Sequence, residues 1–174
     1  MTQNNLYLTV GPSGSGKSTT IRKYADANPN SVIISRDTIR FSLLGENDSY
    51  FSKEKEVFKL FIEKIQKALD AGKDVYADAT HLNYASRHKL LSNLHIGNET
   101  KISVLYFQTP LEECLKRNKN RSGFAYVPEE VIKKQFQSVK FPQYEEMVRL
   151  KYFSISSIFP EKEDKINGQN FCNK

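Results

Sequence analysis

Short apolar runs alternate with helical patterns along most of the chain. Runs rich in β-branched and aromatic residues predict strands at residues 6–10, 31–35, 74–78, 101–107 and 152–156. Between these runs, apolar residues recur at helical spacing, which predicts helices at about residues 18–27, 37–44, 53–71, 84–94, 110–118 and 128–138. Segment 53–71 has the clearest apolar face, formed by Val57, Phe58, Phe61, Ile65, Ala68 and Leu69.

This alternation predicts an α/β fold, with a five-stranded, mostly parallel sheet and helices on both of its faces. Such sheets bind ligands at the carboxyl ends of their strands. No internal repeat or linker interrupts residues 1–159, which we expect to form one domain. Residues 160–174 are polar and contain few apolar residues, so we expect a loosely held tail.

A glycine-rich segment follows the first predicted strand and opens the first predicted helix. Residues 11–18 match G-x-x-x-x-G-K-[ST] at every fixed position. In this setting, backbone N–H groups and a helix N-terminus cradle phosphate groups. The predicted nucleoside triphosphate site comprises Gly11, Pro12, Ser13, Gly14, Ser15, Gly16, Lys17, Ser18 and Thr19. An ordinary glycine-rich turn is the alternative interpretation.

Two side chains of this segment have specific roles in such loops. Lys17 is predicted to reach the β- and γ-phosphates of ATP, and the Ser18 hydroxyl is predicted to bind Mg²⁺. The motif therefore identifies a phosphate donor and leaves the phosphate acceptor undefined.

Composition limits the class of protein. Of 174 residues, 26% are charged and 39% hydrophobic, which is typical of a soluble globular domain. No apolar run approaches the ~18–20 residues that span a membrane, and residues 1–5 do not resemble a signal peptide. Two cysteines, Cys114 and Cys172, favour neither a zinc site nor a disulfide framework. We therefore expect a cytoplasmic protein without a membrane association.

The chain is basic, with a formal net charge of +6 and a pI near 9.2. This charge suits a polyanionic partner such as nucleic acid, although a solvated basic surface would explain it equally well. Nothing in the sequence indicates an obligate protein partner.

A possible catalytic carboxylate follows the second predicted strand. Asp37 would lie at that strand's carboxyl end, where it could accept the proton of an acceptor hydroxyl and align its oxygen with the γ-phosphorus. The alternative is an N-cap of the following helix, and both roles can coexist. Arg40 is one helical turn further on and could contact an acceptor phosphate or steady Asp37. An ordinary surface arginine is the simpler interpretation of Arg40.

The third predicted strand ends in a second carboxylate. Asp78 could hold Mg²⁺ through water, as a Walker-B carboxylate does, or bind an acceptor hydroxyl. A turn or cap residue is the alternative. Thr80 is expected to line the same pocket, and Arg87, early in the next helix, could face it. We do not expect His81 to be catalytic.

A basic stretch near Gly123, within residues 115–140, suits a lid over the phosphates. Arg121 there could stabilise charge on the transferring γ-phosphoryl group. A solvated basic face is the alternative interpretation. Four aromatic residues are candidates for stacking on bases, although core packing or a plain surface position is the simpler interpretation of each: Tyr50, Phe51, Phe124 and Tyr126.

Taken in order, these motifs resemble the P-loop polynucleotide 5′-hydroxyl kinases. The resemblance rests on the phosphate loop, Ser-Arg-Asp-x-x-Arg at residues 35–40, Asp-Ala-Thr at residues 78–80, and Arg-Asn-x-x-Arg at residues 117–121 followed by Val-Pro. It covers about residues 5–140 and is closest to the kinase domain of phage-type polynucleotide kinase. The Asp-x-Asp-x-Thr motif of that enzyme's phosphatase domain is missing.

The resemblance implies a P-loop kinase fold with a helical lid, ATP as phosphate donor and Mg²⁺ as cofactor. It implies phosphate transfer to 5′-hydroxyl ends of DNA or RNA, with Asp37 as general base and single-stranded ends as a plausible substrate. It further implies that Arg40 contacts the acceptor's 3′-phosphate, and that Arg121 and Arg117 contact the donor phosphates. Asp78 matches an aspartate of only some family members.

Two other classes fit the same motifs. A small-molecule kinase of this fold, acting on a nucleoside, sugar or nucleotide-sugar as zeta-type toxins do, would need the same donor site. A non-catalytic nucleotide-binding module would leave the carboxylate and the lid arginines without a role. An acceptor groove that is open at both ends would favour a nucleic-acid strand over a small molecule.

Overall fold

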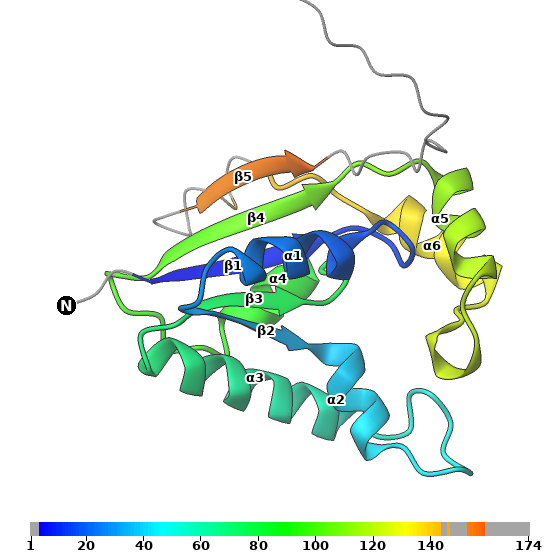
Figure 1. Ribbon diagram of the computed structural model, residues 1–174, viewed down its shortest axis with the longest axis horizontal. Helices are drawn as coiled ribbons and strands as arrows, with labels where there is room; N and C mark the ends of the chain where they lie inside the picture. Colours follow the sequence, from blue (N-terminus) through cyan, green and yellow to red (C-terminus); the bar gives the residue numbers. More distant parts are fainter. Residues whose placement is uncertain (1–3, 144–145, 147–152, 159–174) are drawn as a thin grey trace, which may run out of the picture.

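The computed structural model describes residues 4–143, 146 and 153–158. Its sheet has five strands in the order β2-β3-β1-β4-β5, and every pairing is parallel (Figure 1). The strands are β1 (Asn5–Val10), β2 (Ser31–Ser35), β3 (Asp74–Asp78), β4 (Lys101–Phe107) and β5 (Phe153–Ile158). The predicted five-stranded parallel sheet is confirmed.

Helices connect the strands and lie close to their predicted positions. They are α1 (Lys17–Asp26), α2 (Arg36–Leu43), α3 (Glu54–Asp70), α4 (Tyr84–Leu91), α5 (Leu111–Lys119) and α6 (Glu129–Ser138), with the short 3₁₀ helix η1 (Gly123–Ala125) before α6. Helix α4 ends three residues earlier than predicted, because residues 92–94 form a turn. The predicted tail at residues 160–174 lies outside the described residues.

Two apolar clusters show that helices cover both faces of the sheet. On one face, Leu6 and Leu8 of β1 belong to a cluster that contains Phe61 of α3 and Leu90 of α4. On the other face, Ile21 of α1 packs in a cluster with residues of β3 and β4. Burial of these clusters away from water is the main stabilising term for such a sheet. None of the described helices has the length and apolar character needed to cross a membrane.

The parallel strands bring separate parts of the sequence to one end of the sheet. Ser35, the last residue of β2, pairs with Asp78, the last residue of β3. The backbone N–H of Gly11, just after β1, donates to the Thr80 carbonyl at 3.1 Å. Figure 1 shows the strand arrows pointing toward the end of the molecule where α5 and α6 lie. The predicted ligand-binding edge is thus formed by the loops that follow β1, β2 and β3.

Candidate active site

The glycine-rich segment adopts a conformation that requires glycine. Gly16 caps α1 with φ +92°, a left-handed conformation that disfavours other residues. Gly14 has φ +84°, and a Cβ there would lie 2.4 Å from the Cys114 carbonyl oxygen. No side chain caps the N-terminus of α1. Its first backbone N–H groups can therefore bind phosphate oxygens.

Lys17 lies beneath this loop. Its side chain is buried, and its Nζ donates to the carbonyl oxygens of Gly11 at 3.0 Å and Pro12 at 2.7 Å. Burial lowers the pKa of Lys17 to about 8, while the negative charges of Asp78 and Asp37 oppose this shift and Arg121 reinforces it. Lys17 therefore lies within electrostatic range of Asp78, Asp37 and Arg121.

Ser18 and Asp78 meet at the start of α1. The Ser18 hydroxyl donates to Asp78 Oδ2 at 2.8 Å. Burial raises the pKa of Asp78, and the hydrogen bond from Ser18 and the charge of Lys17 act in the opposite direction. A hydroxyl and a carboxylate are the hard oxygen ligands that Mg²⁺ prefers, with phosphate oxygens and water completing the shell. The described residues contain no cluster of three His, Cys, Asp or Glu side chains for another metal site.

Neither aspartate caps a helix. The N-cap of α2 is Ser35, whose hydroxyl accepts from the Thr38 N–H, and Asp37 lies within the first turn. The N-cap of α4 is Asn83, which forms a capping box with Ser86. The capping alternative is therefore wrong for both carboxylates, and the side chain of Asp37 remains 62% exposed.

A network of side chains holds Asp37 in place. Arg40 donates to Asp37 Oδ1, and the Tyr50 hydroxyl donates to the same oxygen at 3.0 Å. Arg40 also donates to Glu54 Oε2 at 2.8 Å and to the Tyr50 oxygen at 3.0 Å. Arg40 is almost fully buried, so this network places its charge beside the carboxylate and limits the motion of both groups.

Two members of this network, Tyr50 and Glu54, were not predicted to contact Asp37 or Arg40. Tyr50 was predicted only as a possible stacking residue, and Glu54 was not singled out. Glu54 begins α3, where an acidic side chain also interacts favourably with the helix dipole, so nothing local distinguished it. Both residues reach Asp37 or Arg40 through contacts between α2 and the following segment, which the sequence pattern does not reveal.

A cavity of about 470 Å³ joins the loop and this network. The predicted site residues that line it come from the phosphate loop, the ends of β2 and β3, and the lid: Ser13, Gly14, Gly16, Lys17, Ser18, Thr19, Asp37, Arg40, Asp78, Thr80 and Arg121. Three other loop residues, Gly11, Pro12 and Ser15, are buried and do not line the cavity. The carbonyl oxygens of Gly11 and Pro12 accept hydrogen bonds from Lys17 Nζ. The structure thus gathers most of the predicted site.

Polar contacts hold the lid together and connect it to the phosphate loop. Asn118 of α5 donates to the Val127 carbonyl at 2.7 Å and accepts from the Val127 N–H at 3.0 Å. Gln135 of α6 accepts from the Ser13 N–H of the phosphate loop at 2.8 Å. These contacts place the exposed Arg121 on the wall of the cavity.

Two predicted arginines lie elsewhere. Arg87 is only 1% exposed and forms a bidentate pair with Glu146, at 2.5 and 2.8 Å, so it has no access to an acceptor. Arg117 pairs with Glu113 one turn earlier in α5, at 2.8 Å, and does not line the cavity. The predicted role of Arg87 in substrate binding is therefore wrong, whereas the predicted role of Arg117 in donor binding stays a prediction.

Comparison with known proteins identifies the family of the chain. The model of the AAA domain family (AAA_33) matches residues 6–142. A putative bifunctional polynucleotide kinase/RNA ligase of Autographa californica nuclear polyhedrosis virus is 30% identical over 145 residues, which are 76% of this chain and 20% of that protein. An L-seryl-tRNA(Sec) kinase of Methanococcus maripaludis is 30% identical over 146 residues, 79% of this chain and 53% of that protein. The chain thus spans about half or less of these relatives.

Solved structures show the same fold. A chain of the Pnkp1/Rnl/Hen1 RNA repair complex superposes with a TM-score of 0.69 and 25% identity, covering 80% of this chain and 45% of that one. A gluconokinase from Sinorhizobium meliloti 1021 superposes with a TM-score of 0.55 and 18% identity, covering 90% of this chain and 84% of that one. The chain belongs to the AAA domain family, and the proteins that it resembles are P-loop kinases, polynucleotide kinases among them.

Proposed function

We propose that this kinase transfers the γ-phosphate of ATP to the 5′-hydroxyl end of a polynucleotide. The observation that carries the proposal is the position of Asp37, an exposed carboxylate held by Arg40 and Tyr50 in the same cavity as the phosphate loop. The names of the viral relative and of the RNA repair complex support a nucleic-acid acceptor. The net charge of +6 is consistent with such a polyanion.

In the proposed reaction, Asp37 accepts the proton of the 5′-hydroxyl while the hydroxyl oxygen bonds to the γ-phosphorus. The bond between the γ-phosphorus and the bridging oxygen breaks, which leaves ADP and a 5′-phosphate end, and Asp37 then returns its proton to water. Lys17 and Arg121 would stabilise the negative charge of the transferring group. Arg40 would contact the phosphate on the 3′ side of the first nucleotide.

Ser18 and Asp78 would hold Mg²⁺, directly or through water. The ion, when bound, neutralises charge on the β- and γ-phosphates. Because the Ser18 hydroxyl donates its hydrogen to Asp78, its oxygen lone pairs would remain available to the ion.

An acceptor panel tests this proposal. The protein is incubated with γ-labelled ATP and, in parallel, with 5′-hydroxyl DNA, 5′-hydroxyl RNA, the same oligonucleotides carrying a 5′-phosphate, nucleosides and gluconate. We expect label only on the 5′-hydroxyl oligonucleotides. Exclusive labelling of a nucleoside or of gluconate would contradict the proposal.

The second candidate is a small-molecule kinase. The cavity volume of about 470 Å³ is compatible with it, since small-molecule sites fall in the range of about 300–1,000 Å³. The gluconokinase neighbour shares only the fold. If this candidate is right, a nucleoside or gluconate in the acceptor panel should be labelled at least as efficiently as any oligonucleotide.

A further inference from the structure

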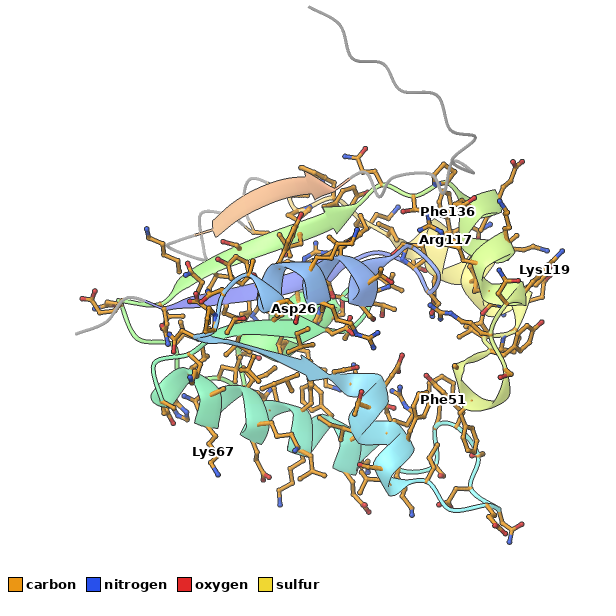
Figure 2. All side chains as sticks on the ribbon, in the orientation of Figure 1. Asp26, Phe51, Lys67, Arg117, Lys119 and Phe136 are labelled. Carbon is orange, nitrogen blue, oxygen red and sulfur yellow. The ribbon has the colours of Figure 1, made fainter. Side chains whose placement is uncertain are left out.

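Aromatic side chains gather at the mouth of the cavity, on the side of α2. We call this group the aromatic rim; its members are Phe41, Tyr50, Phe51, Phe124 and Tyr126. All except Phe41 line the cavity. Phe51 is 65% exposed, Phe124 47% and Tyr126 44%. Figure 2 labels Phe51 in the space between α2 and the segment that follows α5.

Four of the rings of the rim, those of Phe41, Tyr50, Phe51 and Phe124, form a chain of contacts. The Phe51 and Tyr50 centroids are 4.8 Å apart with nearly perpendicular planes, and Tyr50 packs edge-on against Phe41 at 6.3 Å. Phe41 stacks on Phe124 at 6.1 Å with planes 22° apart. Because Phe41 belongs to α2 and Phe124 to η1, the rim runs from the acceptor side of the cavity to the lid.

Tyr50 connects the rim to the proposed base. Its hydroxyl donates to Asp37, the proposed base, so the rim adjoins the position of the acceptor hydroxyl. The Arg40 guanidinium lies 4.5 Å from the Tyr50 ring centroid and 5.9 Å from that of Phe51. Aromatic faces therefore lie directly beside a cation on the acceptor side of the cavity.

This arrangement suits a single strand of nucleic acid. Contiguous exposed aromatic surface is unfavourable in water and marks binding surfaces more often than isolated apolar residues do. Proteins that bind single strands combine aromatic rings, which stack on bases, with cations that bind the phosphates. Stacking tolerates any sequence because every base has a π-face.

We propose that the aromatic rim stacks on the unpaired nucleobases of the first two nucleotides of the acceptor strand. This inference rests on the proposed function and makes it more specific. In a duplex end, those bases are paired and stacked on their neighbours, so the rim favours single-stranded ends and 5′ overhangs over blunt or recessed ends.

A fluorescence titration tests stacking directly. The chain contains no tryptophan, so Phe51→Trp introduces a single indole into the rim, and Phe136→Trp provides a matched control on α6. Phe136 is also exposed but does not line the cavity, and it lies well apart from Phe51 in Figure 2. We expect a 5′-hydroxyl oligonucleotide to quench the first indole strongly and the second hardly at all. Equal quenching of both, or of neither, would overturn the inference.

Kinetics test whether stacking serves the reaction. For Phe51→Ala and Phe124→Ala, we expect the KM for a single-stranded oligonucleotide to rise about 5- to 160-fold, since each stacked base contributes roughly 1–3 kcal/mol. The KM for ATP should stay within about twofold, and Phe136→Ala should behave as wild type. With an acceptor that lacks the first two bases, wild type and rim variants should become equal.

The outcomes separate this inference from the proposed function. If the wild type phosphorylates oligonucleotides and the rim variants match it, the inference is wrong and the proposed function stands. A rise in the KM for ATP, or an equal loss on the acceptor without bases, would also overturn it, since the rim would then bind the donor or merely support the fold. If only a small molecule is phosphorylated, both proposals fail.

Discussion

The donor half and the acceptor half of the cavity are built differently. The donor half is built mainly on one contiguous loop, residues 11–18, whose backbone conformation depends on glycines and whose lysine is buried. The acceptor half places an exposed carboxylate among side chains from α2, the segment after it and α3. The donor half therefore has the construction of a phosphate loop found in many P-loop kinases, whereas the acceptor half is the region that we propose to select the substrate.

The largest effect is expected from the donor half. Lys17→Ala should lower kcat/KM on the order of 10³-fold, because it removes the buried cation that would stabilise the transferring phosphate. The measurement is steady-state transfer of labelled phosphate, with circular dichroism as a check of folding. A folded variant that loses less than about tenfold would show that the loop is not the donor site.

On the acceptor half, Asp37→Asn should lower kcat on the order of 10²-fold or more, because an amide cannot accept the acceptor's proton. The KM for ATP should change little, since Asp37 lies on the acceptor side of the cavity. Single-turnover kinetics would separate the chemical step from product release. Transfer at the wild-type rate would show that Asp37 is not the base.

The donor half should also respond to pH. Since burial lowers the pKa of Lys17 to about 8, its phosphate-binding charge is lost as the pH rises through that value. We expect kcat/KM for ATP to fall about tenfold per pH unit above pH 8. If Lys17→Arg retains measurable activity, this fall should disappear, since arginine stays charged. An unchanged fall in Lys17→Arg would assign it to another group.

The same shift has a consequence for stability. Between pH 8 and the ordinary lysine pKa of 10.5, the unfolded chain binds more protons at Lys17 than the folded chain does. The contribution of Lys17 to the free energy of unfolding therefore increases with pH across this window.

The smallest effect is expected for Tyr50→Phe, which keeps the ring of the rim and removes only the hydroxyl that donates to Asp37. A hydrogen bond of about 0.5–1.5 kcal/mol corresponds to a loss of roughly 2- to 12-fold, expected in kcat and not in the KM for the oligonucleotide. Tyr50→Leu should additionally raise that KM. Equal effects of the two variants would show that the ring itself contributes nothing to acceptor binding.

The sequence predicted what local patterns determine. Buried parallel strands appear as apolar runs, and the phosphate loop is one contiguous motif, so both were placed to within a few residues. The error for Arg87 arose because its partner, Glu146, is 59 residues away and no pattern links them. The pairing of Arg117 with Glu113 could have been expected, because Glu113 precedes it by four residues and such pairs are common on helices.

The acceptor half was only partly predictable for the same reason. Asp37 and Arg40 stand at the end of a predicted strand, but Tyr50 and Glu54 reach them from outside that element. Likewise, the candidate stacking residues Tyr50, Phe51 and Phe124 look unremarkable in sequence. Only the packing of α2 against the lid brings their rings, through Phe41, into one rim.

We propose that Asp37 directs the γ-phosphate of ATP to a 5′-hydroxyl end. One oligonucleotide, prepared with a 5′-hydroxyl and with a 5′-phosphate end, is incubated with γ-labelled ATP and either the wild type or Asp37→Asn. We expect label on the 5′-hydroxyl oligonucleotide alone, and a loss on the order of 10²-fold in the variant. Equal labelling of both oligonucleotides, or full activity of the variant, would contradict it.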